Sequence, residues 1–457
     1  MLHGPIFRKL LYITFPIFLM STLQQLFNAS DTAIVGHFSS AEAMAAVGSN
    51  APVINMIVTF FTGLSVGSNV MLSHFIGKNE ENRVNDALHT SFMVALISGF
   101  IMLFLGQVIA VPILQLLHTP SHVLPMAQAY LRIYFLGMPF LMVYDFGSAV
   151  LRSIGDTRRP LYYLLTAGLI NVGLNLFFVV VLKRNADGVA IATTISNGVS
   201  AALILRALIK ENGMLHLDLR RLSLKWNYVR RILWIGAPAG LQGMIFSISN
   251  VVIQAAINLF GSKCIAGNSA ALNLEYICYF TVYAFCQALM TFVSQNYAAG
   301  TYERCRRTTR IAFISAIGFT AVISLGFFLL RHPLLMLFTH DSRVIHYAMI
   351  RMLFIALFEP MTALYEVPGA SLRGIGRSII PTIITMLGCC LLRIIYMHAM
   401  IKSFTAFYQV VIIYPISWTV TGAAMIIFYF IVIKRAYRAR RSLYQVACAT
   451  ANVSLII

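Results

Sequence analysis

The group in this sequence with the clearest chemical meaning is a carboxylate, Asp31, which lies inside a long apolar stretch. Asn28 precedes it by three residues and Gln24 by seven, so all three side chains share one face of a helix. An ionised group in hydrocarbon is costly, and burial favours the protonated form of a carboxyl. We therefore predict that Asp31 takes up and releases a proton, as a proton-coupled carrier requires. A structural carboxyl that is hydrogen-bonded to a neighbouring helix is the alternative.

Three further polar residues in apolar stretches are candidates for the same cation-binding site. Asn171 and Asn175 lie four residues apart, on one face of a helix, and Thr193 lies in a run of small residues that permits close helix approach. We expect these side chains to meet Asp31 in a polar cluster. The alternative is that they only join neighbouring helices by hydrogen bonds.

A second set of charged residues suggests gating. Asp145 and Glu366 each precede an arginine, Arg152 and Arg373, by seven residues, which is two helical turns or about 10 Å. An ion pair between these acids and a basic residue of a neighbouring loop would act as a gate. A structural hydrogen bond at a helix end is the competing interpretation.

The second half of the chain has its own candidates. Glu275 and, twelve residues further on, Gln287 are predicted to face a cavity in that half and to contact substrate or cation. Glu366 is a third candidate for this role. Glu359 precedes Pro360 and marks a place where a helix is expected to bend.

Apart from the coupling ion, we predict no metal and no cofactor. The seven cysteines lack C-x-x-C spacing, and His118 and His122, on either side of Pro120, have no third ligand nearby. Neither a P-loop nor a hydrolase signature occurs in the sequence. We therefore expect no enzymatic activity.

These polar groups need apolar helices to hold them. Of the 457 residues, 59% are hydrophobic and only 11% charged, where a soluble protein carries about 25% charged residues. Apolar stretches of roughly 20 residues, long enough to cross a bilayer, recur along the chain. They lie near residues 13–37, 48–72, 90–112, 126–149, 160–182, 187–210, 231–258, 267–293, 311–330, 345–371, 378–401 and 406–434. The sequence therefore predicts an all-α integral membrane protein with twelve transmembrane helices.

The chain also repeats itself. LRSIG at 151–155 returns as LRGIG at 372–376, and Ser73, Arg83 and Pro139 recur as the same residue types 221 positions later. An even number of spans per repeat keeps both repeats in one orientation, which predicts a parallel repeat of two pseudo-symmetric six-helix bundles. The expected units are a first lobe at 1–212, a basic linker at 213–230, a second lobe at 231–441 and a tail at 442–457.

The formal net charge of +19 is explained by membrane topology. Most of the 34 lysines and arginines lie in the termini and in loops on one side of the predicted membrane, and they are densest at 206–231. The positive-inside rule then predicts that both termini and the linker are cytoplasmic. We expect a multi-pass protein of the plasma membrane, monomeric, with the lipid bilayer and small molecules as partners and no nucleic acid.

Several segments carry a resemblance to a known family. FNASDTAIVG around Asp31, LRSIGDTRRP, NVGLN at 171–175, SQNYAAGTYER and LRGIGRS are similar to motifs of the MATE (multidrug and toxic compound extrusion) family. The resemblance spans nearly the whole chain. It implies a V-shaped transporter of two six-helix lobes that exports organic cations in exchange for H⁺ or Na⁺. The family's cation site then maps onto Asp31, Asn171, Asn175 and Thr193.

Two departures from the family bear on the coupling ion. Many members have an aspartate where this chain has Asn175, and some use an acid in the seventh span, where this chain has none. Asp31 is then the only acid of the site, which favours H⁺ over Na⁺.

Other function classes stay open. A related flippase or exporter of lipid-linked substrates would need several basic residues in its cavity, and here only Arg393 is placed for that. A membrane channel would pass current without coupling. An enzyme would need a catalytic constellation, and we find none in the sequence.

Overall fold

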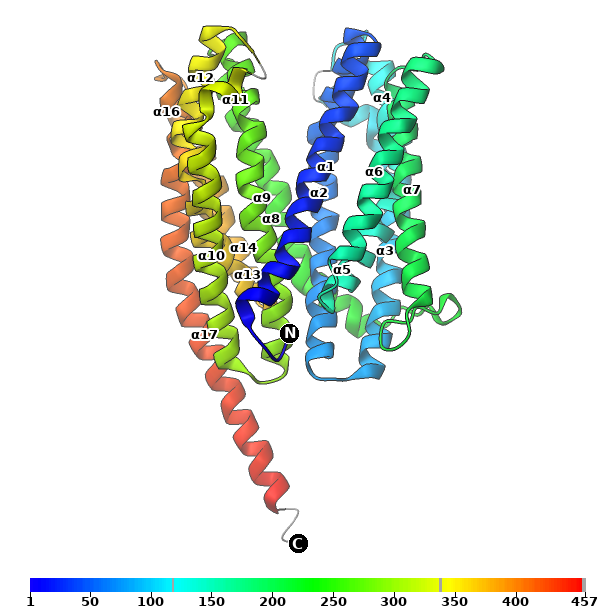
Figure 1. Cartoon of the computed structure of the whole chain (residues 1–457), viewed down its shortest axis with the longest axis vertical. Coiled ribbons are helices and arrows are strands. Elements are labelled where there is room, and N and C mark those ends of the chain that lie inside the picture. The colour runs from blue at the N-terminus through cyan, green and yellow to red at the C-terminus, as the bar shows by residue number, and fades with distance from the viewer. Residues whose placement is uncertain (117–118, 337–338, 454–457) are drawn as a thin grey trace.

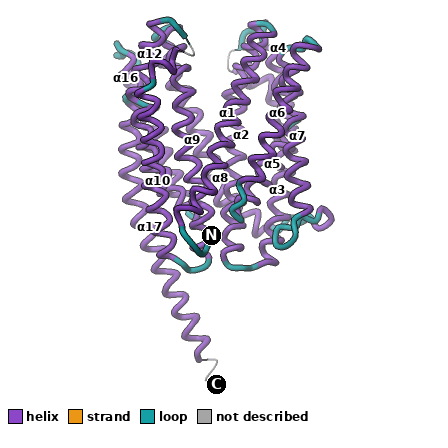
Figure 2. The backbone as a smooth tube through the Cα atoms, viewed as in Figure 1, coloured by secondary structure: helices purple, strands orange, loops and turns teal. Residues whose placement is uncertain are grey.

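The computed structural model of the protein describes residues 1–116, 119–336 and 339–453. Over these residues the chain is predominantly helical and contains no strand. Within these ranges, eleven helices are long and apolar enough to cross a membrane, and α4 (Leu124–Leu136) and α5 (Met138–Ser153) together form a twelfth, bent span. The predicted fold class, an all-α membrane protein of twelve spans, is confirmed. Figure 2 shows the loops gathered at the two ends of the helices.

The helices before the basic linker form the first lobe, which Figure 1 shows on one side of the molecule. Besides α4 and α5, they are α1 (Ile6–Phe38), α2 (Ala41–Gly77), α3 (Glu81–Leu116), α6 (Arg158–Leu176), a π-helical segment (Phe177–Val181) and α7 (Ala186–Lys210). Buried apolar residues from this lobe, such as Leu72, Leu88 and Phe146, join in one hydrophobic cluster.

The second lobe follows a short 3₁₀ turn in the linker (Leu219–Arg221). Its elements are α8 (Trp226–Asn258), α9 (Ser262–Ala298), α10 (Tyr302–Leu329), α11 (Arg331–Met336), α12 (Ser342–Phe354), a 3₁₀ segment (Ala356–Thr362), α13 (Ala363–Gly374), α14 (Ile379–Thr385), a π-helical segment (Met386–Leu391), α15 (Leu392–Met400), α16 (Phe407–Val411) and α17 (Ile413–Val453). A second hydrophobic cluster fills this lobe and includes Leu10 and Ile17 of α1. Because Ile34 and Val35 belong to the first cluster, α1 bridges the two lobes.

Both lobes contain a broken span. α4 and α5 meet at Gly137 with a bend of 46°, and Pro139 lies in the first turn of α5. In the second lobe, the 3₁₀ segment that separates α12 from α13 contains Glu359 and Pro360. Proline has no backbone N–H to continue a helix, so the two prolines, related by the repeat, account for both breaks.

Matching helix ends display the repeat in the backbone. Gly155 and Gly376 both adopt a left-handed conformation, with φ of 89° and 82°. In each case the glycine amide donates to the carbonyl three residues earlier, and the next amide donates to the carbonyl five residues before it. The same cap recurs at Asn79 and Gly300, again 221 residues apart. Each pair forms the Schellman motif that commonly ends helices.

The lobes are in closest contact where α2 crosses α8. Gly63 and Gly67 on α2 meet Gly236 and Gly240 on α8, and both pairs have the G-x-x-x-G spacing. A Cβ at Gly63 would lie 2.2 Å from the backbone nitrogen of Gly240. Only glycine leaves room for two backbones at this distance, so these four residues determine how closely the helices approach.

The basic linker is held against the ends of the first-lobe helices. Lys225 Nζ lies 2.6 Å from the carboxylate of Asp86, and the ring of His89 lies 3.1 Å from the backbone of Asp218. Just before the linker, Glu211 pairs with Arg159 at 2.5 Å. These contacts connect the linker to the start of α3 and of α6.

Candidate functional site

Three helices of the first lobe bring polar residues together around Asp31. Asp31 lies on α1, Asn171 and Asn175 lie on α6, and Thr193 lies on α7. α1 packs on α6, and α6 packs on α7. The four-residue spacing on α6 places both asparagine side chains on the face that meets the other two helices.

The four residues form one connected hydrogen-bond cluster. Asn175 Nδ2 donates to Asp31 Oδ1 over 2.5 Å, and Thr193 Oγ1 lies 3.5 Å from Asp31 Oδ2. Asn175 Nδ2 also donates to Asn171 Oδ1 at 3.1 Å, and Asn171 Nδ2 lies 3.4 Å from Thr193 Oγ1. A fifth residue, Ser196, accepts from Asn171 at 3.4 Å. It was not predicted, although its position three residues after Thr193 on one helix face was a usable signal.

The cluster is buried. Asp31 is 9% exposed and Asn175 is fully buried, and burial of a carboxylate costs free energy that its two hydrogen bonds offset in part. Asn175 Oδ1 has no hydrogen-bond partner among the described residues. The site therefore offers a carboxyl that can take up a proton, together with amide and hydroxyl oxygens of the kind that bind hard cations.

The polar face of α1 extends beyond this cluster. Gln24 and Asn28 are both exposed, and within the described part of the chain neither forms a side-chain hydrogen bond to Asp31. α1 contacts α6 on one side and α9 on another, which leaves part of its surface uncovered. Of the three residues predicted to share this helix face, Gln24 and Asn28 are exposed and Asp31 is buried.

In the second lobe, Glu275 is engaged in an ion pair. Its Oε2 lies 2.7 Å from Arg351 Nη2, and the two side chains are 12% and 3% exposed. Arg351 also donates to Asn268 Oδ1 at 2.6 Å. Gln287 is buried on the same helix, α9, and the structure does not bring it into this hydrogen-bonded group. Glu275 therefore forms an ion pair with a buried arginine.

The predicted gating residue of the second lobe pairs within its own helix. Glu366 Oε2 lies 3.6 Å from Arg373 Nη1, and both side chains are largely buried. Arg373 also donates to Gln242 of α8 at 2.8 Å. The pair thus connects α13 with the helix that forms the closest contact between the lobes.

The corresponding acid of the first lobe has a different partner. Asp145 Oδ2 accepts a hydrogen bond from Thr62 of α2 at 3.0 Å. Arg152 Nε is buried without a hydrogen-bond partner in the described residues. The two acids of the repeat therefore have unlike surroundings, one with a hydroxyl and the other with a guanidinium.

Among the described basic side chains of the second lobe, Arg393 is the most deeply buried. It is 1% exposed, and its Cζ lies 4.3 Å from the ring centroid of Tyr414 and 5.3 Å from that of Phe246. Its Nε donates to Ser417 Oγ at 2.9 Å. Glu359, the predicted bend residue, is also buried, and its Oε2 has no hydrogen-bond partner among the described residues. The interior of this lobe holds buried charges of both signs. His118 of the histidine pair lies outside the described residues.

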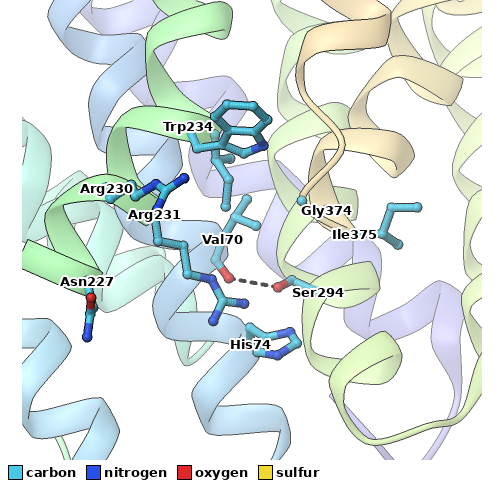
Figure 3. A pocket seen from close by; sticks show the side chains of 11 residues that line it. Val70, His74, Asn227, Arg230, Arg231, Trp234, Ser294, Gly374 and Ile375 are labelled. Atoms are coloured by element: carbon cyan, nitrogen blue, oxygen red, sulfur yellow. Dashed lines mark hydrogen bonds between the residues drawn. The ribbon is translucent and has the colours of Figure 1, made fainter. Parts of the chain in front are cut away.

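Hydrogen bonds close the interface between the lobes at the end where the N-terminus lies (Figure 1). They run from α9 to the first lobe: Thr291 Oγ1 to Asn69 Oδ1 at 3.1 Å, Ser294 Oγ to the Val70 carbonyl at 2.8 Å, and Gln295 Nε2 to the Ser153 carbonyl at 2.6 Å. Figure 3 shows the Ser294–Val70 bond. We call this group of contacts the seam. At the opposite end, which carries α4 and α12, Figure 1 shows the two lobes lying apart.

A helical membrane protein of two parallel repeats, with a buried carboxylate–amide cluster in one lobe and a closed seam at one end, has the architecture of a secondary transporter. The sequence profile of the MatE family matches residues 16–177 and 238–397, one segment in each repeat. The two segments cover most of the chain, which therefore belongs to the MatE family.

Individual proteins of known name agree with this assignment. The chain is 26% identical to the "Probable multidrug resistance protein NorM" of Thermotoga maritima over 87% of its own length and 86% of that protein. It is 27% identical to the "FAD transporter" of Shewanella oneidensis over 76% of its own length and 77% of that protein. Its fold matches an "Outward-facing conformation of a multidrug resistance MATE family transporter of the MOP superfamily" with a TM-score of 0.89, at 19% identity, over 96% and 98% of the two chains.

Proposed function

We propose that this protein exports small organic compounds, lipophilic cations among them, by secondary active antiport. The observation that carries the proposal is the buried cluster around Asp31, because a carboxyl that exchanges a cation is the part such an antiporter requires. Membership in the MatE family supports the transport class. The names of relatives, which are multidrug resistance and multidrug export proteins, support the substrate class.

We further propose H⁺ as the coupling ion. Asn175 turns its amide nitrogen, not its oxygen, toward Asp31. A proton needs only one carboxylate oxygen, whereas Na⁺ prefers several oxygen ligands and would require that amide to rotate. Protonation removes the charge that holds Asn175 and Thr193 in place, so the protonated and ionised proteins favour different arrangements of α1 against α6 and α7.

Aromatic residues on α9 support a cationic substrate. The rings of Tyr276 and Phe280 are stacked with centroids 6.0 Å apart, and those of Tyr279 and Tyr283 are 6.4 Å apart. All four side chains are half-buried. The face of an aromatic ring attracts organic cations and contacts their apolar parts, so this series of rings suits lipophilic cations.

For the membrane, we propose that the end carrying the seam, the basic linker and both termini is cytoplasmic. The linker and the adjoining helix ends carry the densest group of lysines and arginines, which the positive-inside rule places in the cytoplasm. The separated ends near α4 and α12 then face outward. We also propose that the protein works as a monomer, since each chain carries both lobes.

The test is transport of a fluorescent lipophilic cation into inverted membrane vesicles, with H⁺ and Na⁺ gradients imposed separately. Uptake should follow an H⁺ gradient alone, stop on addition of a protonophore, and be absent from vesicles that lack the protein. Uptake driven only by a Na⁺ gradient would show that Na⁺, and not H⁺, is the coupling ion. Uptake driven by neither gradient would contradict antiport.

A second candidate is export of an anionic compound. Arg351, Arg373 and Arg393 are all buried in the second lobe, and a relative bears the name FAD transporter. The first two arginines are paired with Glu275 and Glu366, which leaves Arg393 as the buried cation of that lobe with no ion pair in the described structure. Gradient-driven uptake of a flavin nucleotide in preference to the cationic dye would favour this candidate.

A further inference from the structure

A cavity of about 420 Å³ lies beside the seam, distinct from the Asp31 cluster (Figure 3). α8 contributes Arg230, Arg231 and Trp234 to its wall, α2 contributes His74, and the turn at Gly374–Gly376 closes one side. The volume is that of an ordinary small-ligand pocket, which spans about 300–1,000 Å³. The lining is therefore basic, with an aromatic ring, and it draws on both lobes.

The repeat provides a twin of this cavity. α1 and α8 correspond at an offset of 222 residues, as their internal prolines show. The two arginines and the tryptophan of α8 consequently have counterparts on α1, namely Arg8, Lys9 and Tyr12. Two neighbouring basic residues followed by an aromatic residue three positions later thus occur at the same place in both halves.

The twin is already filled by the protein itself. Carbonyl oxygens of the segment Met1–Gly4 accept hydrogen bonds from Lys9 at 2.7 Å and from Arg304 at 2.9 to 3.2 Å. A Cβ at Gly155 would meet the methionine of that segment at 2.7 Å, whereas a Cβ at the matching Gly376 meets only a methyl carbon 4.0 Å away. In one repeat, backbone oxygens occupy the basic chamber, and in the other the corresponding space is the cavity beside the seam.

We propose that the open cavity binds the phosphate group of an anionic lipid from the leaflet on the basic side of the protein. A phosphate oxygen at Arg231 would correspond to the His3 carbonyl oxygen that Lys9 binds in the twin, and arginine side chains present forked donors that suit phosphate. Trp234 is 58% exposed at the edge of the cavity, as expected of a tryptophan at a membrane boundary. Basic pockets between transmembrane helices on the cytoplasmic side are known to hold lipid head groups.

Binding there should favour the closed seam. His74 belongs to α2 of the first lobe, while Gly374–Gly376 belongs to the second, and Val70 and Ser294, which hydrogen-bond across the seam, also line the cavity. A phosphate that contacts both sides binds more tightly when they are together. It therefore shifts the protein toward the state in which this end is closed.

The experiment compares thermal unfolding of the purified full chain in detergent with added phosphatidylglycerol or phosphatidylcholine. Phosphatidylglycerol should raise the unfolding midpoint more than phosphatidylcholine does. In the double variant Arg230→Gln and Arg231→Gln, its apparent affinity should fall about fivefold for each arginine removed. The matched control is Arg8→Gln, which changes the same residue type in the filled twin and should keep the wild-type response.

Two further measurements distinguish the possible ligands and test the site. If inorganic phosphate alone raises the midpoint, and only when Arg230 and Arg231 are present, the site stands and its ligand is soluble phosphate. If phosphatidylglycerol raises the midpoint of every variant alike, the proposal is overturned. Should the double variant not fold, quenching by brominated phosphatidylglycerol decides: it should exceed quenching by brominated phosphatidylcholine and be lost in Trp234→Phe, and equal quenching by both lipids overturns the site.

Discussion

At the scale of single residues, the two lobes hold their buried acids differently. Asp31 has only neutral partners, an amide and a hydroxyl, whereas Glu275 has the guanidinium of Arg351. An acid with neutral partners can be protonated without leaving another charge alone. Protonating Glu275 would leave a buried, uncompensated arginine, which costs several kcal/mol. This difference supports the proposal that Asp31 exchanges a cation and that Glu275 forms a structural ion pair.

Replacing Asp31 by asparagine should abolish gradient-driven export, because asparagine mimics a permanently protonated carboxyl and cannot release a proton. Expression and unfolding temperature should stay near wild type, since the side chain keeps its size and can still hydrogen-bond. Dye transport in inverted vesicles under an imposed H⁺ gradient measures the effect. The control is Asp187→Asn, which removes an acid paired with Arg184 at the start of α7 and should leave transport intact. Normal export by the Asp31 variant would exclude this residue from coupling.

Replacing Glu275 by glutamine should destabilise the protein by about 3–5 kcal/mol, because Arg351 would remain buried without its counter-charge. The measurement is the unfolding temperature in detergent. Asp341→Asn is the control: Asp341 pairs with Lys263 on the surface at 2.9 Å, and its loss should leave the unfolding temperature unchanged. An equal change of unfolding temperature in both variants would show that the buried ion pair stabilises the protein no more than the surface pair does.

The cluster around Asp31 could be predicted from sequence because each member is a polar residue in an apolar helix, at spacings that define a face. The surroundings of Arg351 and Arg393 could not be predicted from the sequence. Their partners, such as Glu275 and Tyr414, lie on other helices. Hydropathy shows that a helix is buried but not which neighbours its long side chains reach. For the same reason Glu275 was expected to face a cavity, and the structure places it against an arginine.

At the scale of elements, apolar length and the repeat were sufficient to predict twelve spans. The fourth, expected as one segment at 126–149, is broken into α4 and α5, and Gly137 followed by Pro139 was the signal for that break. The π-helical segments in the fifth and eleventh spans had no comparable signal, because an extra residue per turn is a response to tertiary packing. The α2–α8 crossing was likewise not singled out, although both of its G-x-x-x-G patterns stand in the sequence.

Replacing Gly240 by alanine should destabilise the contact between the lobes by about 1–3 kcal/mol, because two backbones must separate to admit a methyl group. The new Cβ would lie 2.2 Å from the carbonyl oxygen of Phe60. Gly318→Ala on α10 is the matched control, since no atom lies within 4 Å of its added Cβ. The unfolding temperature should fall in the first variant only. A similar fall in both would show that the crossing is not the cause, because the higher helix propensity of alanine by itself favours both variants.

At the scale of the whole molecule, the lobes are joined at one end by the seam and lie apart at the other (Figure 1). Alternating access requires this end to open at another stage of the cycle. The seam consists of a few hydrogen bonds to backbone and side-chain oxygens, without an ion pair among those that we describe. Such contacts can be exchanged for water at modest cost, as each is worth roughly 0.5–1.5 kcal/mol.

Joining the lobes covalently at the seam should stop transport. Asn69→Cys and Thr291→Cys, whose native side chains are 3.1 Å apart, should be introduced into a background without other cysteines and linked by oxidation or by a short bifunctional thiol reagent. Vesicle uptake should be lost on linking and return on reduction of the disulfide. The single variant Asn69→Cys, treated identically, should continue to transport. Full transport by the linked protein would show that the seam does not open.

The position of the α2–α8 crossing makes these two helices levers with unequal arms. On α2, ten residues separate Gly67 from Gly77 at the seam end, and twenty-six separate it from Ala41 at the other. At 1.5 Å per residue the arms are about 15 Å and about 39 Å long. Rocking by about 10° then moves the Gly77 end by roughly 3 Å and the Ala41 end by roughly 7 Å, whereas Asn69 and Val70, which lie close to Gly67, move by about 1 Å or less. A small displacement on the side of the seam is thereby coupled to a wider change of aperture on the other side.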